Sequence, residues 1–400
     1  MVDLTDVNFD DHDATLDDFL EAVARNHAPS ERVYLGGSEI GKPCSRELYY
    51  SFHKVAPQHF QPKTYLNFDD GHGSEDKTGG IFKQIDGIEL ITHEGDRQIG
   101  YEAVGGHMKM HLDGMIKGVK QAPKTWHIWE HKCVNEKKFR DLQRKKVKLG
   151  PKEALEAWDE TYFGQSQVYM GLANATSLAM GGSGVKRHYL TVATPGTRDI
   201  MSCRTNFQPE KFKALIEKAE SIVYAKEPPP PISDKADYYI CRWCNFNEHC
   251  HGSKVAAVNC RTCAHVTAQT DGTWHCGFHN NTLSFTKQMK GCSKHLFIPQ
   301  LVPFADAVKF DKDANTITYV TPNGKAFTNA EKNEWSEWAS GTPEITSKDL
   351  QHLDAVLVEG DEHFFAAAAV FDPTIASVKK AKKKPETPLA PLDDALPEWM

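Results

Sequence analysis

The sequence predicts an α/β fold, a mixed central sheet flanked by helices, over about residues 30–252. Segments rich in β-branched and aromatic residues alternate with segments whose apolar residues recur at helical spacing, as expected of strands and helices packed in layers. A proline run, EPPPPIS (227–233), stops the last helix and stiffens the connection that follows. An acidic segment (1–29) precedes this core. A smaller cysteine-rich region (253–375) and a tail (376–400) follow it.

The expected elements follow the chain in order. TLDDFLEAVARNH (15–27) has helical spacing, CSRELYYSFHK (44–54) predicts a second helix, and FDDGHGSEDKTGGIFKQI (68–85) predicts a glycine-rich turn running into a third. Strands are predicted at 87–94, 97–106, 109–118, 125–134, 186–195 and 198–207, with helices at 152–176 and 209–225. In the second region, NTITYVTPNGKAFTN (315–329) predicts a hairpin, because Asn-Gly favours a tight turn.

Composition and charge indicate an ordinary globular protein with room for more than one core. Of the 400 residues, 40% are hydrophobic and 25% are charged. No apolar run approaches the ~20 residues that a membrane span needs. The net charge of −7 is a local feature, because the first 21 residues carry eight acidic side chains and no Lys or Arg. This acidic start is not a signal peptide, and we expect a cytoplasmic protein.

Two carboxylates and a lysine stand out among the predicted strands. In TWHIWEHKCV (125–134), Glu130 and Lys132 are two residues apart, so in a strand they project from one face. Asp113, in HLDGM on the preceding strand, would join them if the two strands pair. Two carboxylates can bind Mg²⁺, and the lysine can orient or deprotonate a metal-bound water that attacks a phosphodiester. The alternative is three unrelated polar residues on a solvated surface.

Asp113 followed by Glu130-x-Lys132 resembles the metal site of the PD-(D/E)XK nuclease superfamily. GHGSE (71–75) resembles the Gly-xxx-Glu/His element of its RecB-like branch, and Glu75 fills the acidic position. QSQVY (165–169) resembles the Gln-xxx-Tyr motif of that branch. Together the motifs cover about residues 40–250.

The resemblance implies a nuclease fold and a site that holds Mg²⁺ or Mn²⁺. It implies that Glu75, Asp113 and Glu130 bind the metal and that Lys132 activates water. Gln165 and Tyr169, at i and i+4, share one helix face, which in this family points at the active site and the DNA backbone. Both side chains can hydrogen-bond phosphate oxygens. Taken without the other motifs, the same two residues describe an ordinary half-buried helix face.

A first cysteine set combines one early and three late residues: Cys44, then Cys241, Cys244 and Cys250 spaced C-x2-C-x5-C. Without a secretory signal, such clusters bind metal more often than they form disulfides. Four thiolates suit an iron–sulfur cluster or tetrahedral zinc, and spacing does not choose between them. The order resembles the [4Fe–4S] clasp of CRISPR-adaptation and AddB-type nucleases, which ties the two ends of the nuclease domain together. The alternative for Cys44 is a buried free thiol.

A second cysteine set follows as C-x2-C-x12-C-x15-C, formed by Cys260, Cys263, Cys276 and Cys292. The opening CxxC and four ligands predict a closed structural Zn²⁺ site. His279 and His295 each lie three residues after a cysteine and could replace one of them. The alternative is thiols that bind no metal, although so small a region needs a metal or a cross-link to be stable. Cys133 and Cys203 lack partners at ligand spacing, and we expect them in the core.

A basic segment, KKFRDLQRKKVKLGPK (137–152), joins the Glu-x-Lys strand to the Gln-xxx-Tyr helix. Its position beside the expected site favours phosphate neutralisation over a merely solvated face. The residues expected to contact DNA are Lys137, Lys138, Arg140, Arg144, Lys145, Lys146 and Lys148.

The function that fits these features is a magnesium-dependent DNA exonuclease. The resemblance implies recombination, repair or phage DNA processing, in the host cytoplasm if the protein is phage-encoded. A structure-specific endonuclease and a non-catalytic zinc-containing DNA-binding adaptor are the alternatives. We expect the tail 376–400 to be disordered. Its acidic, hydrophobic end resembles tails that dock replication partners, such as a single-strand annealing or single-stranded-DNA-binding protein.

Overall fold

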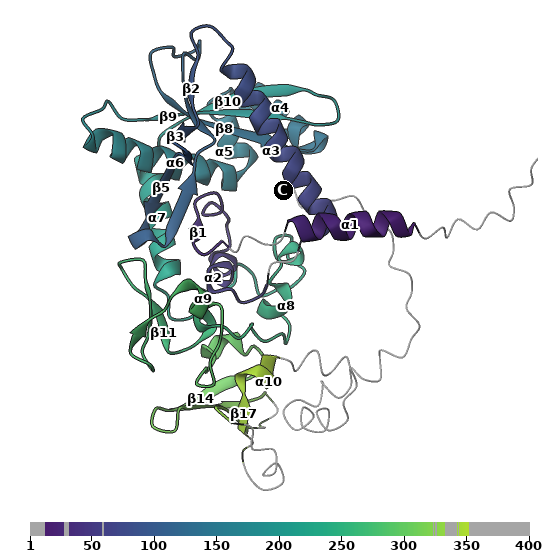
Figure 1. The fold of residues 1–400 in the computed structure, drawn as a ribbon, viewed down its shortest axis with the longest axis vertical. Coiled ribbons are helices and arrows are strands. Elements are labelled where there is room, and N and C mark those ends of the chain that lie inside the picture. The colour runs from purple at the N-terminus through teal and green to yellow at the C-terminus, as the bar shows by residue number, and fades with distance from the viewer. Residues whose placement is uncertain are drawn as a thin grey trace, which may run out of the picture.

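The structure is a computed structural model that describes residues 13–27, 32–57, 60–322, 324, 326–332, 342 and 344–351. The acidic residues 1–12 and the expected partner-docking tail lie outside the described residues. Figure 1 shows a large sheet with its helices at one end of the molecule and two smaller sheets toward the other.

The central sheet is mixed, as predicted, and has the order β10-β9-β8-β7-β2. Its strands are β2 (Glu89–Ile91), β7 (Gly114–Lys117), β8 (His127–Cys133), β9 (Arg187–Ala193) and β10 (Ile200–Asn206). β8 and β9 run parallel, whereas the other neighbours are antiparallel. The expected pairing of β7 with β8 is confirmed, with Gly114 opposite Trp129. β8 therefore lies in the middle of the sheet, where both of its faces are covered.

Helices cover both faces of β8. The helices of this part are α1 (Ala14–Asn26), α2 (Ser45–His53), α3 (Pro62–Phe82), α4 (Glu136–Leu149), α5 (Ala154–Trp158), α6 (Glu160–Ala179) and α7 (Pro209–Val223). Trp129 of β8 packs edge-on against Phe82 of α3, with ring centroids 5.8 Å apart. On the opposite face, Glu130 meets Gln165 of α6. Within the described part, no helix combines the length and the apolar character needed to cross a membrane.

Two expectations for helices need correction. The glycine-rich stretch from 68 is not a turn, since α3 runs through it without a break. A Cβ on Gly79 would lie 3.1 Å from the Trp129 ring, so a glycine here lets the helix approach the sheet closely. The helix expected over 152–176 is divided into α5 and α6 at Asp159, which has extended backbone angles. Its side chain caps α6 by accepting a hydrogen bond from Tyr162 N at 2.9 Å.

Smaller elements complete the fold. A three-stranded sheet of order β1-β6-β5 lies beside α6, and β3 pairs with β4. The bounds are β1 (Leu35–Gly36), β3 (His93–Glu94), β4 (Arg97–Gln98), β5 (Gly100–Ala103), β6 (Met108–His111), and the 3-10 turns η1 (Val104–Gly106) and η2 (Cys241–Trp243), followed by α8 (Asn247–Cys250).

The C-terminal region contains two small sheets, ordered β11-β12-β13 and β14-β15-β16-β17. The expected hairpin at 315–329 is confirmed, because β15 and β16 pair antiparallel and Gly324 has a φ of 79°. The bounds are η3 (Cys260–Thr262), β11 (Val266–Ala268), β12 (Trp274–Cys276), β13 (Asn281–Thr282), α9 (Phe285–Gln288), η4 (Pro299–Leu301), β14 (Asp306–Asp311), β15 (Thr316–Val320), β16 (Ala326–Ala330), β17 (Glu344–Thr346) and α10 (Ser347–Gln351).

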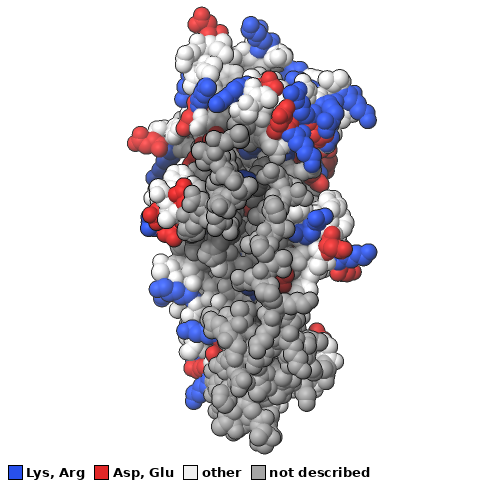
Figure 2. Space-filling model, turned by 90° about the vertical axis from the view of Figure 1, so that its right-hand side faces the viewer, with Lys and Arg blue, Asp and Glu red and all other residues white. Residues whose placement is uncertain are grey.

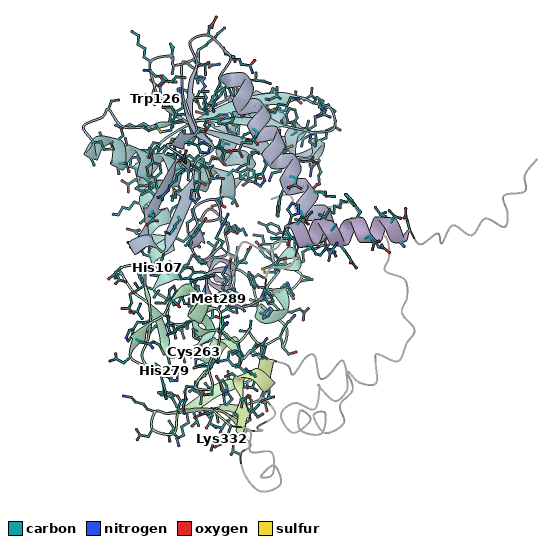
Figure 3. All side chains as sticks on the ribbon, in the orientation of Figure 1. His107, Trp126, Cys263, His279, Met289 and Lys332 are labelled. Carbon is teal, nitrogen blue, oxygen red and sulfur yellow. The ribbon has the colours of Figure 1, made fainter. Side chains whose placement is uncertain are left out.

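The hydrophobic core continues across the boundary expected at 252/253. One cluster of buried residues extends from Leu35 to Leu350. Arg261 joins the two parts: its guanidinium lies over the rings of Trp274 (4.6 Å) and Phe52 (5.3 Å) and donates to the carbonyl of Phe52 at 2.8 Å. His107, labelled in Figure 3, bridges the same boundary through the carbonyl of Gln269 at 2.7 Å. The C-terminal region is therefore part of the same packed body.

Candidate active site and cysteine clusters

Glu130 lies at the centre of the candidate active site. It projects from the middle strand β8 and is 3% exposed. Its Oε1 accepts hydrogen bonds from Lys132 Nζ at 2.5 Å and from Gln165 Nε2 at 2.6 Å. Its Oε2 is buried and has no hydrogen-bond partner among the described residues. A buried carboxylate oxygen without a partner is costly, so this atom has the character of a ligand to a cation.

Asp113 is held where β7 meets β8. It directly precedes β7, and its Oδ2 accepts a hydrogen bond from the backbone N–H of His131 at 2.7 Å. The Asp113 carboxylate therefore accepts a hydrogen bond from the backbone of β8 at the end of the β7–β8 pairing, next to the Gly114–Trp129 pair. This bond fixes Asp113 beside the Glu-x-Lys pair, as the predicted strand pairing required.

Glu75 reaches the site from α3. Burial, the neighbouring carboxylate of Asp113 and that of Asp76 raise its pKa to about 7, while Lys132 opposes the rise. The structure therefore brings together the three carboxylates and the lysine that the sequence predicted, from α3, the β7 edge and β8.

The charges of this group do not balance. Burial and the negative charge of Asp113 raise the pKa of Glu130 to about 8, and burial also raises the pKa of Asp113. Burial lowers the pKa of Lys132, but Glu130 and Asp113 outweigh it and the pKa is raised. Three carboxyl groups face one ammonium, so without a cation their raised pKa values keep protons on the group, and a divalent cation with oxygen ligands would take the place of those protons.

The oxygen-rich donor set and the unpartnered Oε2 of Glu130 fit a hard divalent cation such as Mg²⁺. The side chains are not, however, already arranged around an ion. In the ranges that the structure describes, no three His, Cys, Asp or Glu side chains form a group that could hold a metal as they stand.

Gln165 and Tyr169 lie on the face of α6 that meets the site, and both are 4% exposed. Gln165 bonds Glu130, and Tyr169 interacts with Gln165. The ring of Tyr169 fits beside Gly37, where a Cβ would lie 3.1 Å from it. Both side chains are thus placed to hold the Glu130 carboxylate, and their contact with phosphate stays a prediction.

His131 was missed by the sequence reasoning. It stands between Glu130 and Lys132 and points to the other face of β8, toward α3. Its Nε2 lies 2.8 Å from Ser74 Oγ, and its Nδ1 lies 3.0 Å from Thr191 Oγ1 on β9. Burial and the charge of Lys132 lower its pKa to about 4. The available sequence signal was a histidine at the variable position of Glu-x-Lys, a position that faces away from the expected site.

The basic segment forms the helix α4, whose N-cap is Asn135. Lys138 does not belong to a DNA-binding surface, which corrects the expectation. It is 6% exposed, pairs with Asp159 Oδ2 at 2.8 Å and lies over the Tyr162 ring at 4.5 Å. The lysine therefore holds α4 against the start of α6, because its apolar stem and charge both find partners inside.

The other basic residues of α4 are exposed or half-buried, and several pair along the helix. Arg140 pairs with Glu136 at 3.2 Å, and Arg144 and Lys145 share Asp141. Figure 2 shows Lys and Arg side chains, interspersed with acidic ones, on the upper part of the molecule. Contact between DNA and Lys137, Arg140, Arg144, Lys145, Lys146 and Lys148 stays a prediction.

The first cysteine set is brought together although its members are far apart in the sequence. Cys44, Cys241, Cys244 and Cys250 all line one cavity, between the start of α2 and the η2–α8 segment. Burial raises the pKa of Cys244 to about 12, so this thiol stays protonated unless a cation replaces the proton. Arg46 Nη1 lies 3.7 Å from Cys250 Sγ. A sulfur-only donor set suits an iron–sulfur cluster or zinc.

The second cysteine set also gathers, around η3 and β12. Burial raises the pKa of Cys260 to about 11, and Cys292 and Cys276 add to the rise. His279 belongs to this group: its Nε2 lies 3.6 Å from Cys292 Sγ, and its backbone N–H donates to Cys276 Sγ at 3.5 Å.

His295 has a different environment from His279. Its Nε2 lies 3.0 Å from the carbonyl oxygen of Asn259 and 3.3 Å from Thr262 Oγ1. Of the two histidines that could replace a cysteine, His279 is therefore the one placed beside the thiols.

No protein-family model and no curated protein matches the chain. Solved structures that resemble it include SSO0001 (15% identity, 60% of this chain and 96% of that chain, TM-score 0.33). The alkaline exonuclease LHK-Exo from Laribacter hongkongensis matches at 10% identity over 52% of this chain and 90% of its own, with a TM-score of 0.29. The structure of LHK-Exo in complex with dAMP matches at 11% identity over 52% of this chain and 90% of its own, with a TM-score of 0.32. Likenesses at such TM-scores do not establish a shared fold or activity.

Proposed function

We propose that this protein is a metal-dependent deoxyribonuclease that hydrolyses phosphodiester bonds from DNA ends. The observation that carries the proposal is the buried Glu130 carboxylate, which has one unpartnered oxygen beside Asp113, Glu75 and a single lysine. Burying such a group costs free energy unless a bound cation compensates its charge and coordinates its free oxygen. The resemblance of the sequence motifs to RecB-like nucleases supplies the substrate and the end preference.

Glu75, Asp113 and Glu130 would hold Mg²⁺ or Mn²⁺, which supplies Lewis acidity toward a phosphoryl oxygen when bound. Lys132 has a raised pKa, so it carries a proton and a positive charge. It therefore acts as a donor that orients the attacking water and stabilises negative charge on the phosphate, rather than as a base. Gln165 keeps Glu130 in position through its 2.6 Å bond.

The test is digestion of end-labelled linear single- and double-stranded DNA and of closed circular DNA, with Mg²⁺ or with EDTA. We expect Mg²⁺-dependent loss of the linear substrates and an intact circle. Asp113→Asn should abolish cleavage, whereas Glu89→Gln, an exposed carboxylate in the same sheet, should not. Cutting of the circle would replace the exonuclease by an endonuclease. DNA binding without any cleavage would leave an adaptor.

The two cysteine sets are proposed to be structural. The first, which joins α2 to the segment that follows α7, would hold a [4Fe–4S] cluster as in the nucleases that its order resembles. The second would hold Zn²⁺ through its four cysteines or through three of them and His279. Neither set includes a residue of the carboxylate group, so each would stabilise the fold instead of taking part in hydrolysis.

A further inference from the structure

The hydroxyls around His131 determine the state of its ring. Thr191 Oγ1 donates its proton to the carbonyl of Glu130 at 3.3 Å and accepts from Trp129 Nε1 at 3.0 Å. The Nδ1 of His131, 3.0 Å from the same oxygen, must therefore be the donor. The neutral ring leaves Nε2 as an acceptor, which takes the hydroxyl proton of Ser74 at 2.8 Å. The imidazole is thus a directed bridge from β9 to α3.

Each contact of His131 ends next to a residue of the carboxylate group. Ser74 precedes Glu75 on α3, the backbone N–H holds Asp113, and Thr191 bonds the carbonyl of Glu130. His131 itself stands between Glu130 and Lys132. No other described residue makes all of these hydrogen bonds.

We infer that His131 is a positioning residue that sets the separation between Glu75 on α3 and the carboxylates on the sheet, and with it the affinity of the site for a divalent cation. This inference rests on the proposed function, because it names what organises the proposed metal site. The ring does not touch the metal or DNA; it acts through Ser74 and through its own backbone N–H.

The need for such a bridge follows from α3. This helix contains glycines at 71, 73, 79 and 80, and glycine weakens a helix interior by about 1 kcal/mol relative to alanine. Gly79 lets the helix approach Trp129, but this apolar contact does not fix position along the helix axis as a hydrogen bond does. The bond between Ser74 and His131 provides that register one residue from Glu75.

The experiment measures Mn²⁺ binding by electron paramagnetic resonance in the absence of DNA, so it does not depend on activity. We expect His131→Phe to weaken binding about 10–100-fold, as loss of an outer-sphere partner typically does, and Ser74→Ala about 10-fold. His131→Gln, whose amide can still bond a hydroxyl, should recover part of the loss. Thr78→Ala is the matched control, because its hydroxyl bonds only the carbonyl of Ser74 within α3; it should bind Mn²⁺ like the wild type.

Hydrogen–deuterium exchange gives a second readout. Ser74→Ala should speed exchange of the α3 amides around residues 74–79 and leave β8 and β9 unchanged. Wild-type Mn²⁺ affinity in both Ser74→Ala and His131→Phe, with a wild-type protein that binds Mn²⁺ and cleaves DNA, would overturn this inference alone. A wild-type protein that neither binds Mn²⁺ nor cleaves would overturn the proposed function. If His131→Phe does not fold, the Mn²⁺ affinity of Ser74→Ala alone tests the inference.

Discussion

The buried Glu130 carboxylate should make the metal-free protein less stable as the pH rises. Its pKa is raised from 4.5 to about 8, chiefly by burial and by Asp113. A raised folded-state pKa means that the stabilisation is fully present below about 4.5 and is lost as the pH rises through about 8. Glu130→Gln removes this charge and keeps an oxygen that can accept from Lys132 and Gln165.

The magnitude follows from the size of the shift. One pKa unit corresponds to about 1.4 kcal/mol. Between pH 6.5 and about 8 the wild type should lose on the order of 2 kcal/mol relative to Glu130→Gln, because the carboxyl is ionised in the unfolded chain but still protonated in the folded one; above about 8 the loss is complete. The window lies above the range in which buried histidines such as His131 titrate, with a pKa lowered to about 4. For a chain of this size the difference corresponds to a few degrees in melting temperature.

The assay is thermal unfolding by circular dichroism in EDTA at several pH values, for wild type, Glu130→Gln and the control Glu89→Gln. The melting temperatures of the wild type and of Glu89→Gln should fall equally with rising pH, and more steeply than that of Glu130→Gln. Excess Mg²⁺ should abolish the fall in the wild type, because a cation that binds only the folded state stabilises it. Parallel curves for wild type and Glu130→Gln in EDTA would refute the reasoning.

Three further outcomes are expected. Anaerobically purified protein should be brown with a broad visible absorbance that Cys44→Ser removes; elemental analysis that finds zinc and no iron would refute the cluster. Lys138→Met should destabilise the protein by up to about 3–5 kcal/mol, because Asp159, whose side chain is 9% exposed, loses its ion-pair partner, and should not change the salt dependence of DNA binding. Replacing Arg144, Lys145 and Lys146 together by Ala should reduce the slope of log binding constant against log salt concentration by up to about two units. An unchanged slope would show that these side chains form a solvated surface that does not contact DNA.

The candidate site could be predicted from the sequence where local geometry decides. Glu130 and Lys132 share a face because strands alternate, and Gln165 and Tyr169 share one because helices repeat every 3.6 residues. Ligand spacing identified Cys241, Cys244 and Cys250 as a set, and the resemblance added Cys44, which lines the same cavity. In each case a short period or a fixed chemical requirement carries the information.

The sequence could not predict features that depend on distant partners. Lys138 lies in a run of basic residues, and its burial is decided by Asp159, which caps the next long helix, and by the ring of Tyr162 in the first turn of that helix. The partners of His131 lie 57 and 60 residues away. The glycines of α3 weaken a helix by propensity, and packing against Trp129 overrides that preference.

The position of Arg261 has a consequence for how the chain is made. Its guanidinium donates to the carbonyls of Phe52 and Val33, which precede it by 209 and 228 residues. During synthesis the amino-terminal half therefore leaves the ribosome before those carbonyls have their Arg261 donor and before the Phe52 ring has its contacts with Arg261 and Trp274. At about 5–20 residues per second, completing the remaining elements up to Gln351 takes several more seconds. The nascent chain must remain unaggregated throughout that interval, so its folding finishes late in translation or after release.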